Sequence, residues 1–309
     1  PRATQISGQI SIIYIGLTIA CFLSYIAVEM SGFDALIHAL TTVATGGFSS
    51  HDASFSAMEG PAEYVASVYM VLAALPFVRF VQLLNGSAQP IFNDEQIRGF
   101  VATLAVVIGT SAIYLIYSQG FVIELAIRKA TFNIISIMSG TGYASADYML
   151  WGAPMVAIFF FVGLIGGCAG STACSVKIFR YQIMLAAMAT QLKRIQLPSS
   201  VHVPHFQERP ISQDVMDSVM VFFVMFFISL GVLAFLLGLT GLDFITALSG
   251  AATAIGNIGP GLGPEIGPMG NFENLNSAAK GLLIFGMILG RLELMAVFIL
   301  FTRRFWQAA

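Results

Sequence analysis

Three short tracts of glycine and hydroxyl residues have a composition that suits binding of a dehydrated cation. They are Ala44-Thr45-Gly46-Gly47, Ser139-Gly140-Thr141-Gly142 and Gly256-Asn257-Ile258-Gly259, called here the first, second and third glycine tracts. Backbone carbonyl groups can replace the water shell of a cation where the chain runs extended, and glycine permits the backbone angles that this requires. The tracts contain no acidic residue, whereas a divalent-cation site would gather carboxylates. They are therefore predicted to form a filter for a large monovalent ion such as potassium.

The same pattern surrounds each tract when Gly47, Gly142 and Gly259 are aligned. A short amphipathic run precedes the glycine, and longer apolar runs flank the whole unit. The first two units also share an aromatic residue (Phe48, Tyr143), a serine (Ser50, Ser145) and an aspartate (Asp52, Asp147) at equal offsets. This predicts an apolar helix, a half-helix, a polar loop and a second apolar helix in each unit. The negative C-terminal end of each half-helix would then point toward its tract and favour a cation.

The composition indicates an integral membrane protein. The chain is 57% hydrophobic and 10% charged with a mean hydropathy of +0.84, whereas a soluble domain carries about 25% charged residues. Apolar runs of spanning length, which takes ~20 residues, lie at about 10–29, 62–84, 99–118, 153–168, 218–239 and 278–301. A seventh apolar run, about 173–192, is interrupted by Lys177 and Arg180. Polar loops at membrane depth are tolerated where they line protein or water. We expect an all-α membrane fold with re-entrant pore loops around a pore.

The distribution of lysine and arginine predicts which way the loops face. If the three tracts share one side, that side holds Arg128, Lys129 and Lys280. The opposite side holds Arg2, Arg79, Arg98, Lys177, Arg180, Lys193, Arg194, Arg209, Arg303 and Arg304. Because cytoplasmic loops carry the excess of positive residues, the tracts are expected to open outward.

Five motifs resemble one known family. They are HALTTVATGGFSSHDASF (38–55), FNIISIMSGTGYASADYMLW (132–151), GLIGGCAGSTACSVKIFRYQI (163–183), NIGPGLG (257–263) and GRLELMAVFILF (290–301). Together they resemble the TrkH/KtrB superfamily of potassium transporters, specifically its TrkH branch, from end to end of the chain. The resemblance implies repeated M1–P–M2, potassium-channel-like units. Residues 1–90 would be the second family repeat, 91–195 the third, 196–214 a cytoplasmic loop and 215–309 the fourth, with the first repeat expected upstream.

A glycine-rich segment, 163–175, interrupts one apolar run. Each glycine destabilises a helix by about 1 kcal/mol relative to alanine. Several glycines in this segment would therefore be explained either by close helix packing through small residues or by an unwound loop. The resemblance implies the second: a gate below the filter that comprises Gly166, Gly167, Gly170, Ser171 and Arg291. A cation within a span, as predicted for Arg291, must face water, find a partner or snorkel to the membrane surface.

The resemblance also implies the function, location and partners. It implies potassium uptake across the bacterial inner membrane by the ion-conducting subunit of a Trk-type system, a homodimer in the lipid bilayer. A cytosolic nucleotide-binding regulatory subunit of the TrkA type is the implied partner. Potassium is the substrate, no cofactor is expected, and the sequence contains no nucleic-acid-binding patch. The residues alone leave open the coupling ion and the preference for potassium over sodium.

Three other interpretations predict different structures. An intramembrane hydrolase would use Ser171 or Cys174 as its nucleophile and needs a base nearby. A sodium-coupled carrier would contain inverted repeats, whereas these units repeat in the same sense. A metal site at His202 and His205 would need further ligands. The sequence favours the pore over all three.

Overall fold

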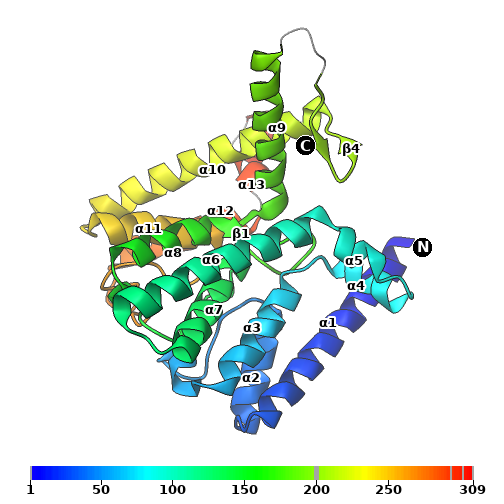
Figure 1. Cartoon of the computed structure of the whole chain (residues 1–309). Helices are drawn as coiled ribbons and strands as arrows, with labels where there is room; N and C mark the ends of the chain where they lie inside the picture. The colour runs from blue at the N-terminus through cyan, green and yellow to red at the C-terminus, as the bar shows by residue number, and fades with distance from the viewer. Residues whose placement is uncertain (1, 198–201, 293, 301–302, 308–309) are drawn as a thin grey trace.

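The computed structural model describes residues 2–197, 202–292, 294–300 and 303–307. The chain is mostly helical (Figure 1). Its elements are α1 (Arg2–Ala27), α2 (Gly32–Val43), η1 (Ser54–Met58), α3 (Pro61–Ala73), α4 (Phe77–Leu84), α5 (Gln89–Asn93), α6 (Glu95–Gln119), α7 (Ile123–Ser139), η2 (Tyr148–Trp151), α8 (Ala153–Leu164), β1 (Ile165–Gly166), β2 (Val176–Lys177), α9 (Ile178–Gln196), β3 (His205–Phe206), β4 (Arg209–Pro210), α10 (Gln213–Leu239), α11 (Phe244–Gly256), α12 (Ser277–Arg291), α13 (Leu294–Leu300) and α14 (Arg303–Gln307).

Each of the three units opens with a long apolar helix. By length and composition, the segments Thr4–Ala27, Glu95–Gln119 and Gln213–Leu239 of α1, α6 and α10 could each cross a membrane. Much of their apolar surface is exposed; on α1, for example, Ile15 and Ile19 are more than half exposed. Apolar side chains at helical spacing on an outer face are what lipid contact requires, so the fold is that of an all-α membrane protein.

A shorter half-helix follows each long helix and ends at a glycine tract. These half-helices are α2, α7 and α11. Ser31 caps α2 by accepting from the Asp34 N–H, and Asp243 caps α11 by accepting from the N–H groups of Ile245 and Thr246. Such caps satisfy amide groups that the first turn leaves unpaired. The predicted order of helix, half-helix and loop is therefore present in every unit.

The returning helix of each unit is broken, and the sequence analysis missed two of the three breaks. The predicted span 62–84 consists of two helices, α3 and α4, whose axes differ by 89°. The break between them ends at Pro76, the residue before α4. Proline disfavours helical geometry at the preceding residue and lacks the N–H that would continue the helix. The predicted span 278–301 divides as well: α12 ends at Arg291 and the next described helix begins at Leu294. In the second unit α8 ends at Leu164 and α9 begins at Ile178.

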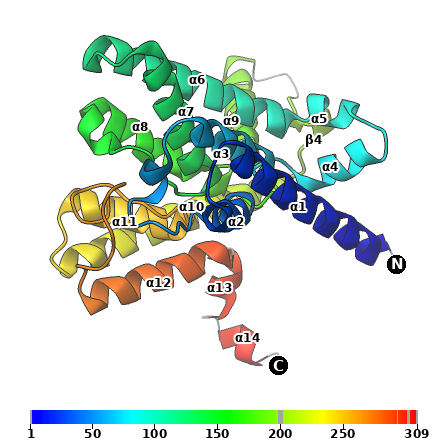
Figure 2. The same ribbon diagram turned by 90° about the horizontal axis from the view of Figure 1, so that it is seen from below.

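The units lie side by side in chain order. The returning helix of one unit packs against the half-helix of the next: α3 against α7, and α8 against α11. Figure 2 shows α6 and α12 at opposite edges with α2 and α11 between them. One buried apolar cluster joins the first two units and another centres on the third. This packing brings the ends of the half-helices together.

The polar connection before the third unit contains a small hairpin. Strands β3 and β4 pair antiparallel, His205 with Pro210 and Phe206 with Arg209. Residues 198–201 of the predicted cytoplasmic loop lie outside the described residues. His205 Nδ1 lies 2.8 Å from the Val203 carbonyl oxygen. Among the described residues, no group of three or more His, Cys, Asp or Glu side chains is placed to hold a metal ion.

Candidate ion-binding site and the loop beneath it

The three glycine tracts lie against one another in the order first, second, third. A Cβ atom added to Gly47 would overlap the carbonyl oxygen of Thr141 in the second tract. A Cβ added to Gly142 would overlap the carbonyl oxygen of Ile258 in the third. A Cβ on Gly259 would lie 3.6 Å from the Cα atom of Gly142. Residues about a hundred positions apart in the sequence therefore share one site.

The backbone of each tract adopts a conformation that glycine favours. The φ angles of Gly47, Gly142 and Gly259 are +67°, +84° and +121°. In this region an L-residue brings its Cβ atom close to the following carbonyl oxygen. Conformation and close approach thus both require glycine at Gly47 and Gly142. The aligned glycines are structurally equivalent, as the sequence pattern predicts.

Each half-helix stops because a residue two positions before the aligned glycine is left-handed. These residues are Thr45, Gly140 and Asn257, with φ of +51°, +74° and +51°. Each donates its N–H to a carbonyl of the last helical turn, at 3.1–3.2 Å. A left-handed residue with such back-bonding is a common helix ending. The C-terminal, negative ends of α2, α7 and α11 therefore meet the tracts, an arrangement that favours a cation there.

A hydroxyl group six residues before each aligned glycine binds the backbone at or just after that glycine, a role that was not predicted from the sequence. The segment that leaves each tract, such as 143–145 after the second tract, is called here the outgoing chain. Thr41 Oγ1 donates to the Phe48 carbonyl at 2.8 Å, and Ser136 Oγ donates to the Tyr143 carbonyl at 2.7 Å. In the third unit Thr253 Oγ1 accepts from the Gly259 N–H at 3.0 Å. The shared offset is visible in the sequence and could have identified these residues.

The segment between β1 and β2 crosses beneath all three half-helices. Strand β1 pairs in parallel with β2, which closes the segment into a loop. The Thr172 hydroxyl shares its proton between two carbonyls at 3.1 Å, that of Val43, the last residue of α2, and that of Ala73, the last residue of α3. The Cys174 N–H donates to Ser139, the last residue of α7, at 3.3 Å, and the Ser175 N–H donates to Gly256, the last residue of α11, at 2.9 Å. The loop thus binds the terminal carbonyl of each half-helix.

The glycines predicted for the gate serve different packing roles: Gly166 ends β1, whereas Gly167 and Gly170 lie in the loop. A Cβ on Gly166 would overlap the Cys174 carbonyl oxygen, and one on Gly167 would lie 3.0 Å from the Ala74 carbonyl oxygen. Gly170 is left-handed, with φ of +74°, and its carbonyl accepts from the Phe77 N–H at 2.9 Å. The segment is therefore unwound, as the resemblance implied, and its glycines permit close packing of the unwound backbone, whereas the alternative of closely packed continuous helices is wrong.

Neither predicted nucleophile has a base among its described contacts. Ser171 Oγ donates to the Cys168 carbonyl at 2.6 Å. Cys174 Sγ lies 3.3 Å from Arg291 Nη1, which is a cation and accepts no proton. Because a base that takes up the nucleophile's proton is what hydrolysis would need, the described geometry does not favour the hydrolase interpretation.

Arg291 is at the end of a helix, which corrects its predicted position within a continuous span. It is the last residue of α12, is exposed, and donates through Nη1 to Cys174 Sγ in the loop. It borders a cavity of about 420 Å³ together with Lys177 and Arg180. The described residues that line this cavity include these three cations and no carboxylate. From the sequence, Lys177 and Arg180 were expected only to lie on the cytoplasmic side.

Comparisons with known proteins agree with this architecture. A profile of the TrkH family, described as a cation transport protein, matches residues 2–308. The chain is 42% identical to the Trk system potassium uptake protein TrkI of Halomonas elongata, over 99% of this chain and 63% of that protein. It is 29% identical to the Trk system potassium uptake protein TrkH of Escherichia coli K12, over 99% of this chain and 64% of that protein.

A solved structure has the same fold. The crystal structure of the potassium transporter TrkH from Vibrio parahaemolyticus superposes with a TM-score of 0.92 at 30% identity, covering 99% of this chain and 66% of that one. The chain spans less than two thirds of the length of the curated relatives named above. The match to the family profile covers nearly every residue. The chain therefore belongs to the TrkH family of cation transport proteins.

Proposed function

We propose that the full-length protein containing this chain takes up potassium across a bacterial inner membrane, with the three glycine tracts as part of its ion filter. The observation that carries the proposal is the contact between tracts, in which Thr141 and Ile258 carbonyls lie against Gly47 and Gly142. Each tract also stands at the negative end of a half-helix. The relatives named as potassium uptake proteins supply the identity of the ion.

A further unit would complete the filter beside the first tract. Tyr143, after the second tract, is fully buried, and its hydroxyl lies 2.5 Å from Thr41 Oγ1 in the half-helix of the preceding unit. Phe48, at the same offset after the first tract, is 73% exposed. A preceding unit of the same kind would cover Phe48 as the first unit covers Tyr143. We therefore propose four units around the pore.

The loop beneath the half-helices would act as a gate. Its Thr172, Cys174 and Ser175 donors hold the terminal carbonyls of the three half-helices, so an ion leaving the filter meets a hydrogen-bonded barrier. Arg291, which touches Cys174, adds a fixed positive charge below it. A fixed positive charge raises the energy of a cation that passes close to it. Opening would require the loop to leave these carbonyls.

The orientation in the membrane is proposed from the charge distribution, and the partners from the family resemblance. The tracts would open outward, because the side that carries most lysine and arginine residues faces the cytoplasm. A homodimer in the bilayer and a cytosolic nucleotide-binding subunit of the TrkA type are proposed by family resemblance. A sodium-coupled carrier is the alternative function, and ion competition separates it from potassium uptake.

The test is growth and uptake in a bacterium that lacks its own potassium-uptake systems. Expression of the full-length protein should restore growth at low potassium and produce rubidium uptake that potassium inhibits more strongly than sodium. Stronger inhibition by sodium, or no restored growth from protein that reaches the membrane folded, would refute the proposal.

A further inference from the structure

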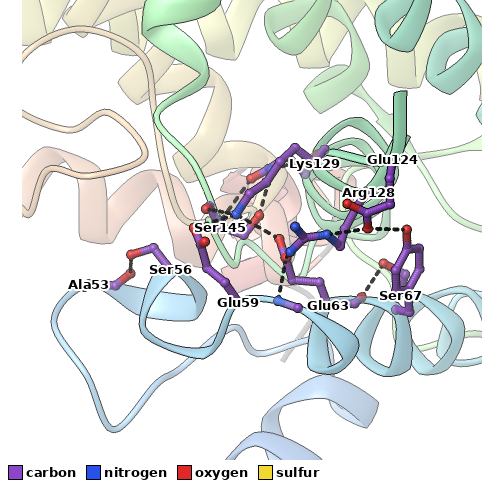
Figure 3. A network of polar contacts seen from close by, with 12 residues as sticks. Ala53, Ser56, Glu59, Glu63, Ser67, Glu124, Arg128, Lys129 and Ser145 are labelled. Atoms are coloured by element: carbon purple, nitrogen blue, oxygen red, sulfur yellow. Dashed lines mark hydrogen bonds and ion pairs between the residues drawn. The ribbon is translucent and has the colours of Figure 1, made fainter. Parts of the chain in front are cut away.

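A cluster of charges with a buried centre joins the first two units on the side of the glycine tracts; Glu59 and Glu124, at its edge, are 55% and 60% exposed. Glu59, just after η1, and Glu63 of α3 face Arg128 and Lys129 of α7 (Figure 3). The Glu63 side chain is fully buried and that of Lys129 is 6% exposed. Arg128 pairs with Glu63 and, through Nε at 2.9 Å, with Glu124. Buried charges of this kind persist where each has a partner.

The Lys129 ammonium group donates two hydrogen bonds and lies beside a second carboxylate. Its Nζ atom donates to Glu59 Oε1 at 2.7 Å and to the backbone carbonyl of Ser145 at 2.8 Å. Glu63 Oε1 lies 3.2 Å from Nζ, an ion-pair contact without a hydrogen bond. Two carboxylates from the first unit thus fix a lysine that binds the chain just after the second glycine tract (Figure 3).

Two other residues of α7 bind the same outgoing chain. Asn133, one turn after Lys129, donates through Nδ2 to Ser145 Oγ at 3.0 Å and accepts the Ser145 N–H through Oδ1 at 3.1 Å. Ser136 donates to the Tyr143 carbonyl at 2.7 Å. Positions i, i+4 and i+7 share one helix face. Lys129, Asn133 and Ser136, called here the α7 clamp, therefore hold the chain from Tyr143 to Ser145.

The first unit has a clamp at the same offsets with different chemistry. Residues 13, 9 and 6 positions before its aligned glycine are Asp34, His38 and Thr41. They hold the outgoing chain through the pairs Asp34–Ser50 at 2.5 Å, His38–Ser49 at 3.0 Å and Thr41–Phe48 at 2.8 Å. The recurrence of three clamping positions in two units, with different side chains, indicates that holding the outgoing chain serves the tract itself.

We infer that Lys129 is a positioning residue that fixes the carbonyl groups of the second glycine tract and so contributes to ion discrimination. This inference rests on the proposed function, because it treats the tract as a filter. Discrimination among monovalent cations depends on the number and placement of carbonyl dipoles. Ser145 is three residues beyond Gly142, so movement of the Ser145 carbonyl is transmitted to the tract through a short, otherwise clamped chain.

The experiment measures rubidium and sodium flux per folded molecule for the full-length protein in proteoliposomes. Lys129→Met removes the charge and all three donors while keeping an unbranched side chain. The rubidium-to-sodium flux ratio is expected to fall about tenfold, which corresponds to ~1.4 kcal/mol. Lys280→Met is the matched control, because Lys280 Nζ also donates to a loop carbonyl, that of Glu273 at 2.8 Å, but the residue is only partly buried and lies outside the clamp. Its ratio should equal that of the wild type.

A second control separates positioning from general stability. Arg128→Gln removes another partner of buried Glu63, but the described contacts of Arg128 are to Glu63 and Glu124 and not to the outgoing chain. It should lower the melting temperature and leave the flux ratio unchanged. If Lys129→Met also lowers the melting temperature without changing the ratio, the positioning role is wrong.

Two further outcomes keep the test decisive. If Lys129→Met does not fold, the double variant Lys129→Met/Glu59→Gln also neutralises the carboxylate whose described partner is Lys129. It is measured in its place, with the same expected fall in ratio and the same refuting result. A wild-type protein with no preference for rubidium over sodium would refute the proposed function. A wild-type preference that the Lys129 variants retain would refute this inference alone.

Discussion

Replacement of Gly142 by alanine tests how closely the tracts must approach one another. The new Cβ atom would overlap the Ile258 carbonyl oxygen, and Gly142 has a φ of +84°. The left-handed conformation alone costs alanine ~1–2 kcal/mol. Relief of the overlap requires a displacement on the order of 1 Å between the second and third tracts. In a site that depends on precise positioning, a misplacement of that size lowers the rate roughly a hundredfold.

We therefore expect rubidium uptake per folded molecule to fall about a hundredfold in Gly142→Ala, because about 1 Å of displacement carries that cost. Uptake is measured in cells that lack other potassium-uptake systems, and the amount of folded protein is measured by size-exclusion chromatography. Gly109→Ala in α6 is the control, since a Cβ there meets nothing within 4 Å and the residue is helical. If rubidium uptake by Gly142→Ala is within a factor of about three of uptake by Gly109→Ala, instead of about a hundredfold lower, the close-approach argument is wrong.

Three other variants probe the gate and the support of the tracts. Arg291→Gln should raise rubidium flux per folded molecule whereas Arg291→Lys should stay near wild type, because the charge repels the cation; equal flux in all three proteins with different yields would show that Arg291 is an anchor. Thr172→Val removes the donor to the Val43 carbonyl and should raise flux in the absence of any activating partner, measured in proteoliposomes; unchanged basal flux would contradict a closing role for this bond. Ser136→Ala removes the donor to the Tyr143 carbonyl and should lower the free energy of unfolding by about 1–3 kcal/mol, as expected when a buried carbonyl loses its partner; an unchanged melting temperature in thermal unfolding would exclude this support.

The elements that depend on local sequence could be predicted. Apolar length identified the long helices α1, α6 and α10, and the repeated glycine pattern placed a half-helix before each tract. The cost of glycine in helices predicted only that segment 163–175 is special, since close packing and unwinding both fit it; the expectation of an unwound loop came from the family resemblance. The break at Pro76 carries an equally local signal, the proline itself, which apolarity over 62–84 outweighed in the sequence analysis.

Contacts between distant residues could not be predicted from one sequence. Thr172 and Val43 are 129 residues apart, and Lys129 and Glu59 are 70 apart. Hydropathy and residue spacing specify helices and faces, but they do not say which of several carbonyls a donor reaches once the units pack together. Arg291 illustrates the same limit, because its place at a helix end and its contact with Cys174 depend on where α12 stops.

The central claim is that the glycine tracts bind the transported ion, and rubidium located by anomalous diffraction tests it most directly. Crystals of the full-length protein soaked in rubidium should show an anomalous peak among the backbone carbonyls of the three tracts, beside Gly47, Gly142 and Gly259. The peak should disappear when potassium replaces rubidium and persist when sodium is added. A rubidium peak elsewhere in the membrane region with none at the tracts would contradict the account.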